Sequence, residues 1–367
     1  MGAAWLMLQL NASPKMTALI QTAMTFPVFL LVIPAGLLAD RYDRRTILLL
    51  TQIIMVLIAL GLSSLISLGN INTSLLLAGV FLLGCGVAIK MPVWQAVISS
   101  LVEPQDIQNA AILNGMSFNF SRSVGPALAG VLAFFGCMTS IFWMNSLFLV
   151  GLAFALLKWR LADKACDTSM AKPPERLKHT DFKLILQTKN LMPLLLRVFL
   201  IFFGASCLWS LFPAFAVLSL RMSSSSIGGL LGMIGVGAVI GGHFLPYLGH
   251  KWGIDRVTRL AAAILGAMLL LISFSQNRLF LWPVMMMAGV GWVFAVLGLK
   301  GVIQSMFSSG LRARAISVYL MAMYAGSTAG SLSWGVLSTD ETMRGSFASA
   351  GLVLITCGVA LKYWPIS

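Results

Sequence analysis

The sequence predicts an all-α membrane protein with about a dozen membrane-crossing helices, and three observations lead to this prediction. Hydrophobic residues make up 59% of the chain and charged residues only 10%, whereas a soluble domain is about 45–50% apolar and about 25% charged. The mean hydropathy of +0.92 shows that apolar segments extend through the whole chain. A helix needs roughly 20 apolar residues to cross the hydrocarbon core, and the chain has 367 residues.

The individual helices follow from the apolar runs and the polar turns between them. Residues 1–10 are apolar but too few to span the bilayer, and they lack the basic region and cleavage site of a signal peptide. We interpret them as the outer end of a truncated first helix, to be followed by about eleven full helices. Those helices are predicted, with an error of about 2–4 residues at each boundary, near 16–39, 46–68, 74–99, 109–134, 139–158, 191–219, 225–249, 256–275, 279–307, 312–337 and 345–365.

A polar stretch with many charges and two adjacent prolines divides the helices into two sets. We therefore predict an N-terminal helical half at 1–158 with an incomplete first helix, a cytoplasmic central loop at 159–190, and a C-terminal six-helix half at 191–367.

The net charge of +14 does not indicate nucleic-acid binding, because Lys and Arg lie in short connections between apolar spans and form no basic face. Short basic loops are typical of the cytoplasmic side of a membrane protein. If the loop after residues 16–39 is cytoplasmic, its side also receives the central loop and the C-terminus. The basic residues predicted on this side are Arg41, Arg44, Arg45, Lys158, Arg160, Lys164, Lys172, Arg176, Lys178, Lys183, Lys189, Lys251, Arg256, Arg259, Arg312 and Arg314. The opposite side receives only Lys15, Arg221, Arg278 and Arg344.

Two parts of the chain repeat each other. The sequence Ala-Ala-Ile-Leu-Asn-Gly from Ala110 leads to Gly-Pro-Ala-Leu-Ala-Gly at 125–130. At the same spacing, Ala-Ile-Ser-Val-Tyr-Leu from Ala315 leads to Gly-Ser-Leu-Ser-Trp-Gly at 330–335. Parallel structural repeats with a site at their interface are an architecture of transporters.

The strongest motif lies between the first two full helices. Residues 36–45 read Gly-Leu-Leu-Ala-Asp-Arg-Tyr-Asp-Arg-Arg, and the candidate conformational residues are Gly36, Asp40, Arg41, Arg44 and Arg45. This segment resembles the signature of the major facilitator superfamily, except that Asp43 stands where the family prefers Gly. The resemblance implies a fold of two six-helix halves. It also implies that Asp40 faces the positive end of the helix near 312–315 and locks the halves on the cytoplasmic side.

A second motif, Arg-Ser-Val-Gly-Pro-Ala-Leu-Ala-Gly at 122–130, resembles the Gly-Pro motif of antiporters and exporters in this superfamily. Proline removes a backbone hydrogen bond and kinks the helix, and small residues allow close helix contact. The resemblance implies a hinge that prevents leakage at Gly125, Pro126 and Gly130. An ordinary proline kink is the alternative.

The chain as a whole resembles the branch of the enterobactin exporter and macrolide-efflux-like proteins, through Gly2–Leu6, Pro27–Leu30, Asn119–Pro126 and Leu311–Ser317. In such relatives about two dozen residues precede the first of these stretches and complete helix 1. The resemblance implies a monomeric, multi-pass protein of the bacterial inner membrane, without a cofactor, and coupling to the proton gradient.

Ionisable residues inside membrane spans are functional candidates, because each costs at least about 2.5–3.5 kcal/mol at mid-helix. Arg122 lies deep enough for a role in the substrate cavity, whereas Arg197 and Lys300 could carry their charges to the interface by snorkelling. For Lys90 both a cavity role and snorkelling stay open. The nearby polar residues could either line the cavity or form hydrogen bonds between helices, and this also stays open. The candidates for the substrate cavity are Arg122, Lys90, Lys300, Asn114, Asn119 and Gln95.

The acidic residues all fall in connections or at helix ends, namely Asp40, Asp43, Glu103, Asp106, Asp163, Asp167, Glu175, Asp181, Asp255, Asp340 and Glu341. Proton relays usually place a carboxylate in the membrane, and the sequence provides none there. Cationic groups without an acid favour an anionic or neutral amphipathic cargo. The spans also carry no cluster of catalytic or metal-ligating residues, which argues against an enzyme or a metal site.

The sequence therefore predicts a secondary active transporter that exports small siderophore-like or drug-like molecules by alternating access. The alternative is an inactive truncated remnant or a membrane protein that does not transport.

Overall fold

The computed structural model describes residues 2–10, 13–101, 106–135, 137–158, 185, 187–188, 190–307 and 309–361. Within its helices, the side chains that are not described are those of residues 39–41, 96, 98–101, 107–112, 115–116, 118–120, 122–123, 309–310 and 313. Most of the central loop predicted at 159–190 therefore lies outside the described residues.

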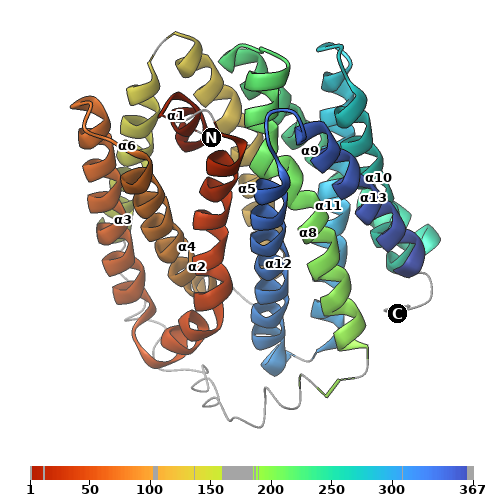
Figure 1. The fold of residues 1–367 in the computed structure, drawn as a ribbon. Helices are drawn as coiled ribbons and strands as arrows, with labels where there is room; N and C mark the ends of the chain where they lie inside the picture. Colours follow the sequence, from red (N-terminus) through yellow and green to blue (C-terminus); the bar gives the residue numbers. More distant parts are fainter. Residues whose placement is uncertain are drawn as a thin grey trace.

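The described chain is helical almost throughout, which confirms the predicted class (Figure 1). Its first part forms α1 (Gly2–Leu10), α2 (Pro14–Arg41), α3 (Arg44–Ser67), α4 (Thr73–Leu101), α5 (Ile107–Phe134) and α6 (Met138–Lys158). Its second part forms α8 (Leu191–Ala214), which continues into a π-helical turn at Phe215–Ser219, and then α9 (Ser224–Trp252), α10 (Ile254–Phe274), α11 (Leu281–Met306), α12 (Ser309–Leu337) and α13 (Met343–Ala360). The predicted boundaries differ from these by only a few residues.

Nine helices within the described residues are long and apolar enough to cross a membrane. Helix α12 is not among these nine, and the continuously described stretch of α5, Val124–Phe134, is apolar but shorter than a full span. Each of these two helices packs along a helix of the other half, α5 along α9 and α12 along α2.

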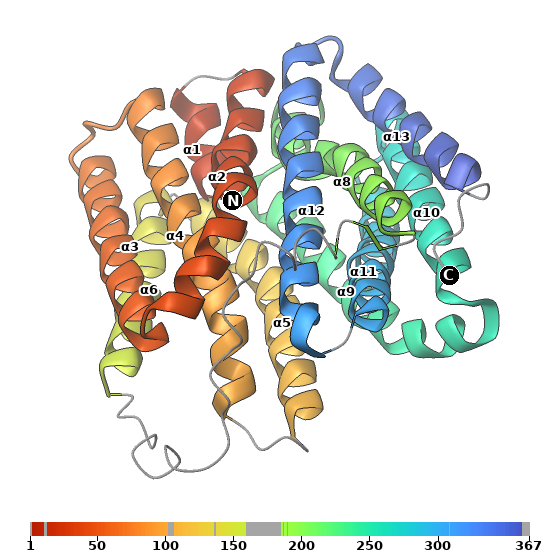
Figure 2. The ribbon, with the colours of Figure 1, turned by 90° about the horizontal axis from the view of Figure 1, so that it is seen from below.

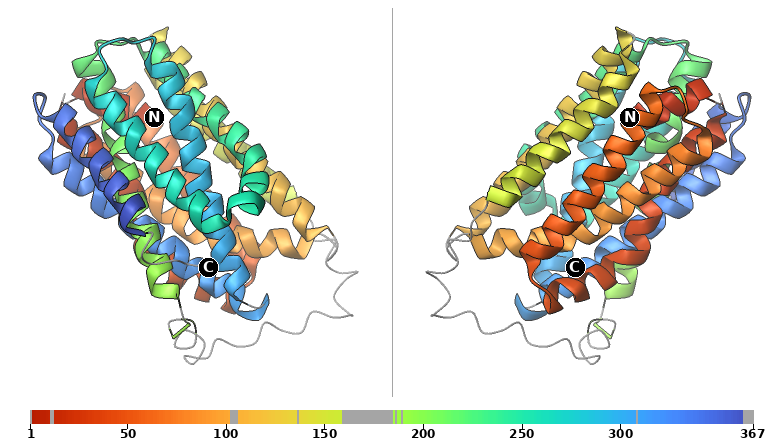
Figure 3. Two further views of the ribbon diagram at one scale, coloured as in Figure 1. Left: turned by 90° about the vertical axis from the view of Figure 1, so that its right-hand side faces the viewer. Right: turned by 90° about the vertical axis from the view of Figure 1, so that its left-hand side faces the viewer.

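The same helix pairs recur in the two halves. The pairs α2–α4, α3–α6 and α3–α4 correspond to α9–α11, α10–α13 and α10–α11. Figure 2 shows α1–α6 on one side and α8–α13 on the other, with α2 beside α12. We call the end at which α2 meets α3 and α9 meets α10 the lower end, and the other end the upper end. The views in Figure 3 show that the helices run between these two ends and that α13 finishes at the lower one.

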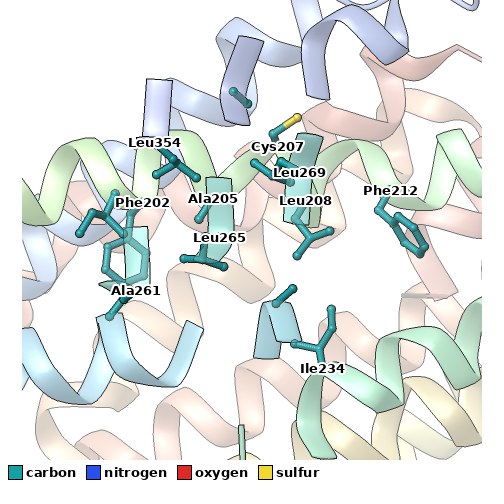
Figure 4. Packing of buried hydrophobic residues seen from close by; sticks show 14 of the residues in the cluster. Phe202, Ala205, Cys207, Leu208, Phe212, Ile234, Ala261, Leu265, Leu269 and Leu354 are labelled. Atoms are coloured by element: carbon teal, nitrogen blue, oxygen red, sulfur yellow. The ribbon is translucent and has the colours of Figure 1, made fainter. Parts of the chain in front are cut away.

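The first helix of each half differs in length. Helix α8 has 24 residues, packs against α12 and α13, and is largely buried. Its counterpart α1 has 9 residues and contacts α2, α4, α6 and α8. Figure 4 shows part of the hydrophobic core around α8, with side chains that include Leu208 of α8, Leu265 of α10 and Leu354 of α13.

The lower ends of the two halves turn in different ways. Between α9 and α10 the chain turns at Gly253, whose φ of +79° is in the region that favours glycine. Between α2 and α3 the equivalent turn contains Asp43, whose φ is −58°. Asp43 caps α3, because its Oδ2 accepts hydrogen bonds from the Thr46 backbone N–H and the Thr46 hydroxyl, both at 2.7 Å. The departure from the family motif at this position is thus a helix cap.

We expect Asp43→Ala to destabilise α3 by about 0.5 kcal/mol, at the low end of the range for helix caps because the site is exposed. The hydrogen bonds from Thr46 lower the pKa of the Asp43 carboxyl. A lowered pKa means that this stabilisation is complete above the usual carboxyl range and is lost as the pH falls through the lowered value. Thermal unfolding of both proteins against pH measures this, and equal acid sensitivity of the wild type and the variant would contradict it.

Candidate functional site

The two halves meet mainly along two helix crossings, α5 with α9 and α2 with α12, and these are the natural place for a transport site. At the first crossing, a methyl group on Gly130 of α5 would lie 2.7 Å from the Gly228 Cα of α9. At the second, a methyl group on Gly335 of α12 would lie 2.6 Å from the Ala18 Cβ of α2. Gly130 and Gly335 occupy equivalent positions in the sequence repeat. The repeat thus places one small residue at each crossing, where the helices need close approach.

The Gly-Pro motif in α5 takes part in the first crossing through two of its three residues. A methyl group on Gly228 would lie 2.6 Å from the Pro126 carbonyl oxygen, so Pro126 and Gly130 face α9 together. Gly125 faces elsewhere, and no described atom lies within 4 Å of a methyl group placed on it. Its repeat counterpart, Gly330, instead packs directly on the Phe203 backbone of α8.

Polar contacts also join the halves at the α2–α12 crossing. The buried Thr328 hydroxyl of α12 donates to the Thr25 hydroxyl of α2 at 3.0 Å, and Thr25 donates to the Gln21 carbonyl at 2.9 Å. Closer to the lower end, Gly36 faces α12. A methyl group placed on Gly36 would lie 3.7 Å from the Ser317 hydroxyl oxygen. Gly36 thus faces α12, the helix toward which the resemblance places Asp40.

The charged motif residues are described only in part. Asp40 and Arg41 lie in the last turn of α2, but their side chains are outside the described residues, so the predicted lock by Asp40 stays a prediction. Arg44 begins α3. The Arg45 Nη2 donates to the Leu157 carbonyl of α6 at 3.3 Å, so this arginine links two helices of the same half.

The polar candidates near the middle of the first half have different surroundings. Asn114 of α5 accepts a hydrogen bond from the Trp94 indole of α4 at 3.2 Å, so this pair joins neighbouring helices. Gln95 is exposed. The side chains of Arg122 and Asn119 lie outside the described part of α5, and their assignment to the cavity stays a prediction.

The two candidate lysines, which lie at nearly equivalent places in the repeat, also have different surroundings. The Lys90 ammonium of α4 donates to Gln52 Oε1 of α3 at 2.8 Å, inside its own half. Lys300 of α11 is half-buried and forms no hydrogen bond or ion pair with the described residues. Among the described residues, Lys300 therefore has no protein partner to give up before it meets a bound anion, whereas Lys90 has Gln52.

Arg197 forms a charged cluster that the sequence did not predict. Its side chain is fully buried and does not snorkel. One guanidinium nitrogen donates to Asp255 at 2.7 Å and to Thr258 at 3.1 Å, and the other donates to the Leu361 carbonyl at 3.1 Å. Arg259 reaches the same carboxylate at 3.1 Å. The cluster joins the lower ends of α8, α10 and α13. In the sequence, the acidic residue in the first turn of α10 is the one feature that could have indicated it.

The described residues contain no group of three or more His, Cys, Asp or Glu side chains that could hold a metal ion. Among them, the sites that link helices instead use backbone proximity, hydroxyls, amides and the Arg197 cluster. The described residues thus show contacts that hold helices together and no centre for bond-breaking chemistry.

Comparisons with known proteins agree with this geometry. Residues 1–366 match a family model described as transmembrane secretion effector. The enterobactin exporter EntS of Shigella flexneri is 24% identical over 350 residues, covering 91% of this chain and 79% of that protein. The uncharacterized MFS-type transporter YfiS of Bacillus subtilis is 30% identical over 138 residues, which are 38% of this chain and only 32% of YfiS. The staphyloferrin A transporter of Staphylococcus aureus is 28% identical over 36% of this chain and 33% of its own length.

Solved transporter structures share the fold. A bacterial homologue of the iron transporter ferroportin, in an inward-facing state, has a TM-score of 0.71 at 17% identity and covers 99% of this chain and 94% of its own. The nucleoside transporter NupG has a TM-score of 0.74 at 11% identity, with 99% and 93% covered. At these identities the likeness concerns the fold alone.

Proposed function

The chain belongs to the transmembrane secretion effector family of the major facilitator superfamily, and from that premise we propose that it exports small molecules by alternating access. It is a multi-pass membrane transporter, and its family is one of transporters and not of enzymes. The observation that carries the proposal is the family match over residues 1–366, supported by the alignment with EntS over 91% of the chain.

We propose that the lower end faces the cytoplasm of a bacterial cell and that the C-terminus lies on that side. The charge distribution supports this orientation, because basic residues gather on the cytoplasmic side of membrane proteins. The described basic residues at the lower end are Arg44, Arg45, Lys158, Lys251, Arg256, Arg259, Arg312 and Arg314. Those at the upper end are Lys15, Arg221, Arg278 and Arg344.

The movement that we propose is a rocking of α1–α6 against α8–α13 about their two crossings. Close contact of Gly130 with Gly228, and of Gly335 with Ala18, lets the helices slide or tilt without displacing large side chains. The Thr25–Thr328 hydrogen bond stabilises the arrangement described here. We propose that the proton gradient drives the cycle and that one chain is sufficient for it.

The cargo that we propose is an anionic or neutral amphipathic molecule such as a siderophore. The described acids Asp43, Asp106, Asp255, Asp340 and Glu341 all lie at or near helix ends, whereas the half-buried Lys300 offers a positive charge within α11. The names of EntS and the staphyloferrin A transporter link two relatives to enterobactin and to staphyloferrin A. We propose that Lys300, Arg122 and Asn119 contact the cargo.

The test is uptake of radiolabelled iron-free enterobactin and of a radiolabelled macrolide into energised inverted membrane vesicles that contain this protein. We expect one of the two compounds to accumulate several-fold over vesicles without the protein, and an uncoupler to abolish the accumulation. Absence of uptake of both compounds, in protein shown to be folded by its thermal transition, would contradict export of these two cargo classes.

A further inference from the structure

Lys90 lies at a junction of three helices inside the first half. Helix α4 ends at Leu101, which places Lys90 about 16 Å above the lower end of its helix. One turn away, the Met55 side chain of α3 packs so closely on Gly86 that a methyl group there would lie 2.5 Å from it. This close contact brings α3 near enough for Lys90 to reach Gln52 at 2.8 Å.

Gln52 is held in one orientation. Its side chain is fully buried, and its amide nitrogen donates to the Leu149 carbonyl of α6 at 2.7 Å. With the nitrogen engaged, the amide oxygen is directed at Lys90. An amide oxygen accepts a hydrogen bond from a charged ammonium and from a neutral amine alike. Gln52 can therefore hold Lys90 in both protonation states.

No described carboxylate neutralises Lys90, whose half-buried side chain forms its hydrogen bond with a neutral amide. A charge inside a membrane span without a counter-ion is costly, so the free energy of the site depends strongly on whether a proton is bound. The described charged groups on or directly before the helices around Lys90 lie at helix ends, and they are Lys15, Asp43, Arg44, Arg45, Asp106, Lys158 and, on α12, Arg312 and Arg314; α12 also brings the Tyr324 hydroxyl next to Met91. The side chains of Asp40, Arg41 and Arg122 are outside the described residues.

The same part of α4 touches the other half of the protein. The residue after Lys90 is Met91, and its sulfur lies 3.9 Å from the Tyr324 hydroxyl of α12. Lys90 itself is hydrogen-bonded to Gln52 of its own half. Separation of α4 from α12 at Met91 would admit water beside Lys90 and favour its charged form, and closure would remove that water. Proton binding and separation of the halves would then be linked.

We propose that Lys90 is the group that binds and releases the driving proton and that Gln52 positions it. This inference rests on the proposed proton-driven export. Lys90 takes up a proton as its amine becomes an ammonium when the site is open to the outside, and it releases the same proton to the cytoplasm after the halves have moved. The cargo moves outward during the return part of the transport cycle. The bound proton favours the state that is open at the lower end.

A distance measurement tests this without any cargo. Spin labels at Tyr42→Cys and Arg256→Cys, introduced after the native cysteines are replaced by serine, report the separation of the halves at the lower end. We expect the wild-type distance to increase as the pH falls. Lys90→Arg, which stays charged, should remain at the long distance, and Lys90→Met should remain at the short distance, each independent of pH. Gln52→Leu should move the transition to another pH.

The matched control is Lys158→Met, which removes an exposed lysine from the same half and should titrate like the wild type. A wild-type titration in Lys90→Met would overturn the proposal, whether or not the protein exports enterobactin. Transport adds a second readout. In Lys90→Met, uncoupler-sensitive accumulation should fall at least about tenfold, while exchange of cargo across vesicles without a gradient continues. Loss of exchange as well would indicate a structural role and contradict the assignment.

Discussion

Gly130→Leu is expected to abolish transport, and Gly130→Ala is expected to reduce it at least about tenfold, because the α5–α9 crossing has no room for a side chain. A methyl group at Gly130 would meet the Ser224 carbonyl and the Gly228 Cα, both at 2.7 Å. Both contacts are with backbone atoms, which cannot rotate away as a flexible side chain would. The halves must therefore separate at this crossing, and overpacking of this kind typically costs about 1–3 kcal/mol.

The matched control is Gly125→Ala in the same helix, five residues away. A methyl group at Gly125 has no neighbour within 4 Å in the described part of the chain, so transport should stay within about twofold of the wild type. The measurement is the initial rate of cargo uptake into inverted vesicles, divided by the amount of folded protein. Equal rates for Gly130→Ala and Gly125→Ala would show that close approach at this crossing is not required.

Arg197→Met is expected to cause the largest loss of stability of any single change discussed here. It removes the Arg197 guanidinium from the Asp255 carboxylate, which keeps its contact with Arg259, and it leaves the Leu361 carbonyl without its guanidinium donor. Breaking a buried ion pair from one side costs about 3–5 kcal/mol, and the remaining Arg259 should keep the loss near the lower value. The thermal transition in detergent should fall by several degrees.

Two further variants test whether the loss of stability comes from breaking the buried ion pair or from removing any positive charge. Arg256→Gln removes an exposed arginine next to Asp255 and should leave the transition almost unchanged. The double variant Arg197→Met with Asp255→Leu removes both charges and should recover part of the lost stability. A double variant that is less stable than Arg197→Met would contradict the pairing as the main source of the loss.

Much of the fold could be predicted from the sequence, because apolar runs and their polar turns have a direct physical meaning in a membrane. The repeat was equally informative, since it placed Gly130 and Gly335 at equivalent positions and the structure places both at crossings between the halves. The cap by Asp43 could also be read locally, because its partner Thr46 is only three residues away.

The direction of a charged side chain could not be predicted. Arg197 and Asp255 are 58 residues apart, and no local pattern signals that their helices meet at the lower end. Lys90 and Lys300 look alike in the repeat, yet one is bound by Gln52 and the other has no such partner among the described residues. Which neighbour a side chain meets depends on helix packing over long separations, and that information is absent from any single segment.

The contrast between Gly125 and Gly330 bears on how the two copies of the repeat can diverge. Gly330 packs directly on the backbone of α8, so almost any mutation there should be removed by selection, whereas Gly125 has no close neighbour among the described residues and can drift. Two positions that descended from one ancestral residue would thus evolve at different rates within a single gene. A saturation-mutagenesis survey should therefore find many tolerated codons at 125 and glycine almost alone at 330.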